Sequence, residues 1–380
     1  MSWQKEYAAL HAELLDHLRW PGRTLKDFRS HPLQQDQVFS ELALRLYAFQ
    51  VRHNRFYGAF VRAAGAADPG SWRDIPPVWT TAFKRARVAA FPQRMCTQYF
   101  LTSGTTEAES GLHEFCDPDL YAAGALAYFR AALLADGQRL RMHILTAAPR
   151  EAPHSSLVFM LDRVRKAFGR PGSRFYLRRG RLATDALVRE LRRAEAEGEP
   201  VFLLGTAFAF VALLEALAAS RLCLRLAAGS RIMETGGFKG RVREVPREEF
   251  YGMITAALGV PRTHIVNEYS MTELSSQCYD AGFAQLLAGV RLPLSRLSVK
   301  ATPPWMRVLV VDPHSGREVE PDERGLIRIY DLANLGSVVA IQTEDIGVRR
   351  REGFEVLGRV AAAPLRGCSL DAENVVSGRV

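Results

Sequence analysis

The sequence has few lysines and lacks the common nucleotide and metal motifs. Only six of its 380 residues are lysine, so arginine supplies most of the positive charge. The net charge is +9. The arginines are scattered, without a basic block or interleaved aromatic residues, which argues against a nucleic-acid partner. The motifs G-x-x-x-x-G-K-[ST], G-x-G-x-x-G, G-x-S-x-G and H-E-x-x-H are all absent. The chain is therefore not a P-loop, Rossmann, serine-hydrolase or zinc-protease sequence of the usual kind.

Long apolar runs and paired cysteines are also missing. No run of about 18 apolar residues occurs, and the N-terminus is charged throughout, so we expect neither a membrane span nor a signal peptide. No C-x-x-C pair is present, which argues against a zinc knuckle and a dithiol redox centre. We expect a cytoplasmic protein whose five cysteines are free thiols: Cys96, Cys116, Cys223, Cys278 and Cys368.

The hydrophobic residues, 48% of the chain, are sufficient for a large core. Between 41 and 60 they recur at helical spacing and predict one amphipathic helix. Short apolar runs then alternate with helical patterns, which is typical of parallel strands joined by helices. Beyond 300, strands alternate with turns only. We therefore predict an α/β fold with a helical extension at 1–40, a core of parallel sheets flanked by helices at 41–300, and a closing antiparallel β subdomain with a short tail at 301–380.

The first candidate site is YFLTSGTTEAESG, at positions 99–111. If the stretch is only a polar turn between a strand and a helix, its glycine allows the turn and its hydroxyl groups form hydrogen bonds with the local backbone. As a ligand loop, its backbone N–H groups and side-chain hydroxyls would hold phosphate oxygens. The residues in question are Thr102, Ser103, Gly104, Thr105 and Thr106.

The second candidate site is NEYSMTELSSQCYD, at positions 267–280, directly after an apolar strand. The carboxyl ends of parallel strands are where ligands bind in α/β folds. There an aromatic ring (Tyr269), a hydroxyl (Thr272) and a carboxylate (Glu273) would come together as candidate cofactor-binding groups. Tyr269 could stack on a base, and Glu273 could hold Mg²⁺. In the alternative interpretation, Thr272 and Glu273 serve the N-terminus of a helix.

The third candidate site is QTEDIGVRRREGFEVLGRV, at positions 342–360. The pattern places Asp345 in a turn after one strand and Arg359 after the next. The carboxylate could accept both hydroxyls of a ribose, and the guanidinium could neutralise a phosphate or pair with that carboxylate. Alternatively, Asp345 caps a turn and Arg359 is a surface charge.

These three stretches, in this order, resemble the adenylate-forming superfamily. The resemblance implies ATP and Mg²⁺ as cofactors: residues 102–106 would bind phosphates, Tyr269 would flank adenine, Glu273 would ligate Mg²⁺ and Asp345 would hold the ribose. Gly236 and Gly237 would bring backbone against the adenine, and Arg359 would mark the hinge. Because the sequence continues only briefly after Arg359, we expect it to lack the mobile C-terminal domain of larger adenylating ligases, with its lysine. Lys84 and Lys239 are the candidates for a replacement cation.

A narrower resemblance covers the chain from about 41 to its end. The runs WRDIPPVWTTAFK, LHEFCDPDLY, METGGFKGR, NEYSMTELSSQCYD and GRVAAAPLRGCSL are similar to those of LuxE-type acyl-protein synthetases. The resemblance implies that a small carboxylic acid, of the fatty-acid class, is activated with ATP to acyl-AMP. The acyl group would pass to Cys368 as a thioester and then to an acyl reductase or another acyl-accepting protein. Glu107 departs from the superfamily loop, where a glycine is usual.

Two other functions are compatible with the same residues. A free-standing adenylating ligase would pass the acyl group directly to CoA or a carrier protein, and Cys368 would then be structural. A degenerate nucleotide-binding scaffold would regulate a partner without catalysis. The joint presence of a metal-type ligand, a ribose-type ligand and a phosphate-type cation favours an enzyme.

Overall fold

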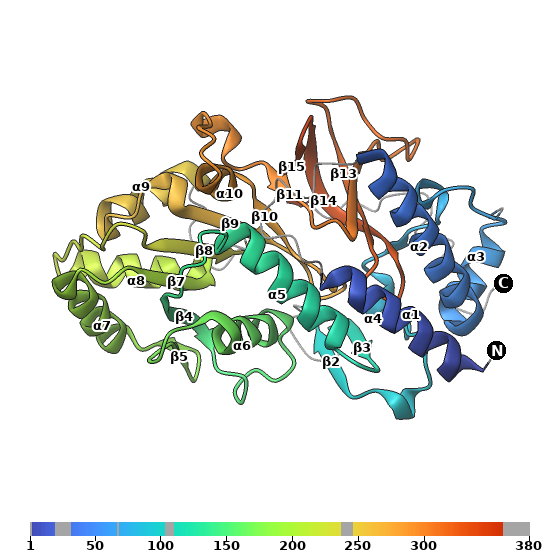
Figure 1. Cartoon of the computed structure of the whole chain (residues 1–380), viewed down its shortest axis with the longest axis horizontal. Coiled ribbons are helices and arrows are strands. Elements are labelled where there is room, and N and C mark those ends of the chain that lie inside the picture. The colour runs from blue at the N-terminus through green and yellow to red at the C-terminus, as the bar shows by residue number, and fades with distance from the viewer. Residues whose placement is uncertain (1, 20–31, 67, 103–109, 237–245, 360–380) are drawn as a thin grey trace. The chain divides into compact units, whose positions relative to one another are not determined.

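The computed structural model describes residues 2–19, 32–66, 68–102, 110–236 and 246–359 (Figure 1). The chain forms two compact units, and neither is one continuous stretch of sequence. The first unit contains Met1–Tyr128, Ser270–Cys278 and Val299–Val380, and the second contains Phe129–Tyr269 and Tyr279–Ser298. Two elements cross these boundaries: helix α5 (Asp119–Leu133) and strand β10 (Cys278–Asp280). Among the described residues no helix is both long and apolar enough to cross a membrane.

The second unit is built on a mainly parallel sheet in the order β9-β8-β7-β4-β5-β6. The neighbouring pairs β9-β8, β8-β7, β7-β4 and β4-β5 are all parallel. Strand β6 pairs antiparallel with β5 in a hairpin. The alternation of strands and helices predicted this parallel arrangement. The strands are β4 (Arg141–Ala147), β5 (Arg174–Arg178), β6 (Arg181–Leu182), β7 (Val201–Thr206), β8 (Arg231–Thr235) and β9 (Ile265–Tyr269).

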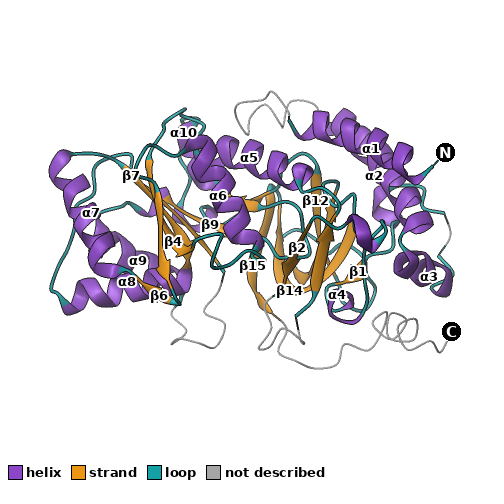
Figure 2. Cartoon of the chain, turned by 90° about the horizontal axis from the view of Figure 1, so that it is seen from below, coloured by secondary structure: helices purple, strands orange, loops and turns teal. Residues whose placement is uncertain are grey.

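Helices cover both faces of this sheet (Figure 2). Helices α7 (Thr184–Glu197), α8 (Ala207–Ala219) and α9 (Arg247–Leu258) lie on one face, where their apolar residues join those of the strands in one buried cluster. Helix α6 (Ser156–Phe168) lies on the other face. Since both faces are covered, the strands can be apolar along their whole length. The short helix α10 (Gly282–Leu287) and the 3₁₀ turns Arg262–His264 and Leu294–Arg296 complete the unit.

The helices of the first unit differ from the sequence-based prediction in one respect. The single helix predicted for 41–60 is two helices, α2 (Pro32–His53) and α3 (Arg55–Ala63). Asn54 separates them because its extended backbone and side-chain oxygen, which accepts from the N–H of Tyr57, form an N-cap. The other helical elements are α1 (Trp3–Leu18), α4 (Ala82–Arg85) and the 3₁₀ turns Trp72–Asp74 and Gln93–Met95.

The strands of the first unit form an antiparallel arrangement in the order β12-β13-β14-β15-β11, with β1 parallel to β14. This confirms the predicted closing β subdomain, since β12 to β15 follow one another through turns alone. A separate hairpin pairs β2 with β3. The bounds are β1 (Val78–Trp79), β2 (Gln98–Leu101), β3 (Leu112–Phe115), β11 (Lys300–Ala301), β12 (Met306–Val311), β13 (Arg324–Asp331), β14 (Ala340–Arg350) and β15 (Gly353–Arg359).

Candidate functional site

The Ser/Thr loop connects two antiparallel strands, β2 and β3, and not a strand and a helix. Leu101 pairs with Leu112, and Thr102 and Gly111 close the base of the loop through two hydrogen bonds. The Thr102 N–H donates to the Gly111 carbonyl at 2.9 Å, and the Gly111 N–H donates to Thr102 Oγ1 at 2.6 Å. Ser103, Gly104, Thr105 and Thr106 lie outside the described residues.

Gly111 is confined from outside the loop as well. A Cβ at this position would lie 3.1 Å from the backbone carbon of Phe83 and equally close to the Thr102 side chain. Helix α4, which carries Phe83 and Lys84, therefore packs against the base of the loop. This packing places the backbone of the exposed Lys84 near the base of the loop.

The segment that carries Thr272 and Glu273 forms a turn between β9 and β10, so the helix N-terminus considered for it is wrong. The turn is fixed by side chains at the end of β13. Asn334 Nδ2 donates to the Glu273 carbonyl at 3.0 Å, and Asp331 accepts from the Ser275 N–H at 2.9 Å and from the Ser276 hydroxyl at 2.7 Å. Buried bonds of this kind set the direction of the backbone at Glu273.

Two hydrogen bonds join this turn to the β2–β3 hairpin. The Thr272 hydroxyl donates to the Leu101 carbonyl at 3.3 Å, and the Thr272 carbonyl lies 2.8 Å from His113 Nδ1. Burial lowers the pKa of His113 to about 4, so the ring is neutral at pH 7 and Nδ1 carries the proton that it donates. His113 was not singled out from the sequence, because its partner is a backbone atom 159 residues away.

Glu273 is a buried carboxyl group, with 7% of its surface exposed. Burial raises its pKa to about 7, and the nearby Asp345 carboxylate also acts to raise it. Its own backbone N–H and the cations Arg359 and Lys84 act in the opposite direction. The structure thus brings Glu273, Asp345, Arg359 and Lys84 into one electrostatic group.

Asp345 and Arg359 lie inside paired strands, which corrects the predicted turn positions. They face each other across β14 and β15, and Arg359 Nε donates to Asp345 Oδ1 at 2.9 Å. The Asp345 N–H donates to Thr343 Oγ1 at 3.1 Å. Asp345 is 6% exposed, whereas the Arg359 side chain is 54% exposed. The pair therefore presents an accessible guanidinium held by a buried carboxylate.

The described residues contain no group of three metal-ligating side chains. Mg²⁺ that accompanies a nucleotide is commonly held by only one or two carboxylates, with water and phosphate oxygens filling its other positions. The buried Glu273 carboxyl can supply one such oxygen, and its raised pKa shows that the protein alone compensates its charge incompletely. The residues present therefore fit the metal that the resemblance implies.

The remaining candidates lie on the second unit or outside the described residues. Gly236 and Tyr269 directly follow the paired residues Thr235 and Glu268 at the carboxyl ends of the neighbouring strands β8 and β9. Gly236 has a positive φ of 84°, a backbone conformation that favours glycine, and no atom of the described residues lies within 4 Å of the position of its missing Cβ. Gly237, Lys239 and Cys368 are outside the described ranges.

Solved structures of acid-activating ligases share this fold. In 2-hydroxyisobutyryl-CoA ligase with 2-HIB-AMP and CoA, the match covers 86% of this chain and 68% of that one, with a TM-score of 0.60 and 15% identity. The same ligase in its postadenylation state matches 90% of this chain and 73% of its own, with a TM-score of 0.57 and 16% identity. ATP-bound MatB from Rhodopseudomonas palustris gives a TM-score of 0.50 at 16% identity over 70% of this chain.

This chain spans about half the length of MatB, 48% of that chain. At such identities the likeness establishes the fold of an adenylate-forming ligase large domain. No curated protein sequence is detectably similar to the chain. The family model described as "Acyl-protein synthetase, LuxE" matches residues 27–376, which is most of the sequence. The chain therefore belongs to the LuxE acyl-protein synthetase family.

Proposed function

We propose that the protein activates a carboxylic acid, of the fatty-acid class, with ATP and transfers the acyl group to a protein cysteine as a thioester. The observation that carries this proposal is the grouping of Glu273, Asp345, Arg359 and Lys84 beside the base of the Ser/Thr loop. Two buried carboxylates and two cations suit a nucleotide with its metal, because the carboxylates can hold metal and ribose while the cations neutralise phosphates.

In the first step a substrate carboxylate oxygen attacks the α-phosphorus of ATP. The new P–O bond replaces the bond to the β-phosphate, and pyrophosphate leaves with that electron pair. When bound, Mg²⁺ would neutralise charge on the phosphates. Arg359 and Lys84 supply fixed positive charge, and Glu273 and the loop base orient the nucleotide. Phosphoryl chemistry depends chiefly on such alignment and charge neutralisation.

In the second step the Cys368 thiolate attacks the acyl carbon of the mixed anhydride. The C–S bond forms as the C–O bond to AMP breaks, and the thiol proton goes to solvent. Arg366 would favour the thiolate, as a neighbouring cation does. An acyl reductase or another acyl-accepting protein would then be the receiving partner.

Carboxylate-dependent exchange of labelled pyrophosphate into ATP tests the first step. Exchange that requires both a fatty acid and Mg²⁺ supports the proposal. If no fatty, short-chain or aromatic acid supports exchange, the protein does not form an adenylate, and the scaffold function is the correct one.

A further inference from the structure

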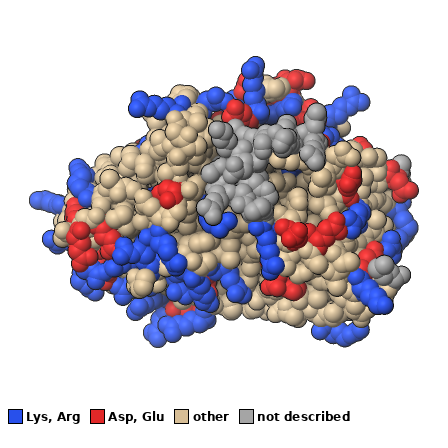
Figure 3. Space-filling model, in the orientation of Figure 1, with Lys and Arg blue, Asp and Glu red and all other residues tan. Residues whose placement is uncertain are grey.

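The positive charge of the protein is concentrated in one part of the second unit. Residues 139–193 contain fourteen lysines and arginines but only four aspartates and glutamates, so this segment alone exceeds the net charge of +9 of the whole chain. Figure 3 shows basic side chains gathered at the lower left, the region of β5, α6 and α7 in Figure 1. The sequence-based description of the arginines as scattered therefore overlooked this basic segment.

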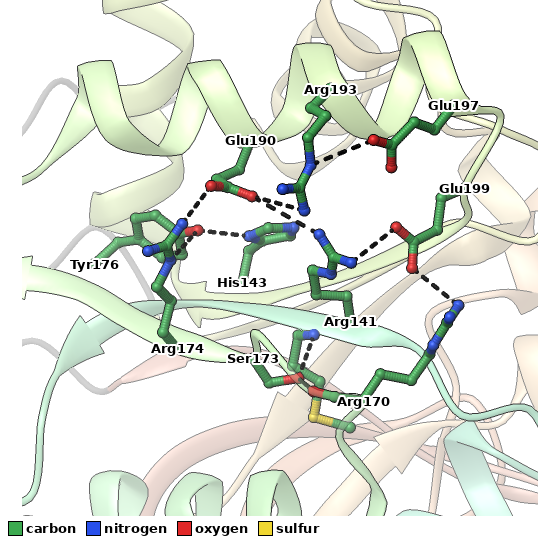
Figure 4. A network of polar contacts seen from close by, with 11 residues as sticks. Arg141, His143, Arg170, Ser173, Arg174, Tyr176, Glu190, Arg193, Glu197 and Glu199 are labelled. Atoms are coloured by element: carbon green, nitrogen blue, oxygen red, sulfur yellow. Dashed lines mark hydrogen bonds and ion pairs between the residues drawn. The ribbon is translucent and has the colours of Figure 1, made fainter.

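One group of these arginines is neutralised by glutamates (Figure 4). It lies at the amino ends of β4 and β5. Arg174 pairs with Glu190 at 2.5 Å, and Arg170 pairs with Glu199 at 2.9 Å. Arg141 lies between the same two glutamates, 3.3 Å from Glu199 and 3.8 Å from Glu190. This group stabilises the unit and leaves little charge for a partner.

A second group lies at the opposite end of β5 and has no such compensation. Arg178, Arg179 and Arg181 surround the tip of the β5–β6 hairpin, and Arg150 follows β4. All four side chains are exposed, and within the described residues none forms an ion pair. We call these four residues the arginine cluster.

The backbone holds the arginine cluster in place. Arg178 pairs with Arg181, so Arg179 and Gly180 form a two-residue turn with positive φ angles of 48° and 74°. Such turns match the twist of the strands and are well defined. The Arg179 N–H also donates to Glu151 Oε2 at 2.8 Å, which ties the hairpin to the loop after β4. The charges are therefore preorganised, which lowers the entropy lost on binding.

The arginine cluster lies at the carboxyl edge of the parallel sheet, where Gly236 and Tyr269 also lie. Four strand spacings separate β5 from β9, or about 19 Å. Phe208, which is 49% exposed, begins α8 at this edge, and α8 packs against β6. Exposed arginines and an exposed aromatic residue on elements that contact each other, with lysine almost absent, have the composition of a protein interface. Nucleic acid would favour several aromatic residues among the charges for base stacking.

We propose that the arginine cluster and Phe208 dock an acidic carrier protein whose thiol accepts the acyl group. This inference rests on the proposed function, since the acyl group formed there must leave on another molecule. A carrier must dissociate after each loading. A small charged patch suits this, because it steers association and gives a short-lived complex. Guanidinium groups also match carboxylate geometry.

The transfer itself is balanced without a further reactant. The carrier's sulfur attacks the acyl carbonyl carbon, the C–S bond forms, and the C–O bond to AMP breaks. The thiol proton goes to solvent. If the acyl group is first held by Cys368, the same attack releases that thiol in place of AMP.

The test uses the holo form of an acyl carrier protein as the probe, with binding followed by fluorescence anisotropy at low and high salt. The triple variant R178E/R179E/R181E should weaken binding roughly tenfold, because it replaces three attractive exposed charges by three repulsive ones. The neutral variant R178Q/R179Q/R181Q should fall between it and wild type. The control R62E/R94E/R317E changes the net charge equally, at exposed arginines of the first unit, and should bind like wild type.

Pyrophosphate exchange separates this inference from the proposed function. All three variants should retain exchange, because none touches the nucleotide site, while acyl transfer to the carrier falls with binding. Three results would overturn the docking proposal: unchanged binding in R178E/R179E/R181E, an equal loss in the control, or wild type that binds single-stranded RNA or anionic vesicles but not the carrier protein. Absence of exchange in wild type would instead refute adenylation and leave the binding comparison intact.

Discussion

Glu273→Gln is expected to stabilise the protein at neutral and alkaline pH while it removes adenylation. Burial raises the pKa of Glu273 to about 7 from an ordinary value of 4.5. The difference of about 2.5 pKa units, at 1.36 kcal/mol per unit, corresponds to about 3 kcal/mol. This free energy is the cost of keeping the ionised carboxylate buried in the folded protein.

The pH dependence of this effect follows from linkage. Below pH 4.5 the carboxyl group is protonated in the folded and the unfolded states, so glutamate costs nothing. Between pH 4.5 and 7 the unfolded state loses its proton first, and the stability of the wild type falls. Above pH 7 the full cost is present. Glutamine does not titrate, so the stability gap between variant and wild type should open from about 1 kcal/mol at pH 5 to about 3 kcal/mol at pH 8.

Thermal unfolding of both proteins from pH 5 to pH 8 measures this gap. In a unit of this size 1 kcal/mol moves the midpoint by about 2–4 °C. Asp331, whose pKa burial raises to about 6, titrates in both proteins and cancels. The matched control is Glu114→Gln, which removes a buried carboxylate paired with Arg87 at 2.5 Å and should destabilise. A gap that is the same at pH 5 and pH 8, or unchanged pyrophosphate exchange in Glu273→Gln, would refute the reasoning.

Three further substitutions test other parts of the site. Asp345→Ala should weaken ATP binding by about 1.5–3 kcal/mol through loss of a charge-assisted hydrogen bond, and equal affinities by calorimetry would contradict the ribose assignment. His113→Phe removes the hydrogen bond to the Thr272 carbonyl, so the rate of exchange should fall about tenfold with little change in ATP affinity; a change in affinity alone would argue against a positioning role. Cys368→Ser should retain exchange but lose the hydroxylamine-sensitive acyl label, and a label that persists in that form excludes Cys368 as the carrier.

Most of the fold could be predicted because its patterns are local. Apolar runs followed by helical periodicity indicate parallel strands, and turns between β12 and β15 indicate antiparallel ones. The prediction of one continuous helix over 41–60 was wrong. Asn54 caps the N-terminus of α3 and interrupts the helix, although the apolar pattern continues on both sides of it. A cap depends on one side chain and one backbone conformation, which hydrophobic periodicity does not report.

The sequence indicated the charged residues of the candidate site. It did not indicate the polar residues that hold their backbone in place. Glu273, Asp345 and Arg359 carry charge after or within strands, which marks them in a sequence. Asp331, Asn334 and His113 act through hydrogen bonds to the backbone of distant residues, and any polar side chain at those positions would look alike in the sequence. Asp345 was predicted to lie in a turn because the segment T-E-D-I-G is polar. In the structure it is buried on a strand, which is possible because Arg359 lies opposite it on the neighbouring strand.

The discontinuous first unit has a consequence for synthesis of the protein. Val78 in β1 pairs with Ile341 in β14, and the Gln50 side chain bonds to the backbone at Asn334 and Val339. The first 128 residues of the nascent chain therefore emerge without the strands that will cover them, whereas most of the second unit is complete by Tyr269. Contacts separated by more than 260 residues close late and slowly. The candidate-site residues Asp345 and Arg359 are thus assembled last, and a chain truncated near residue 300 has an exposed apolar surface that is prone to aggregate.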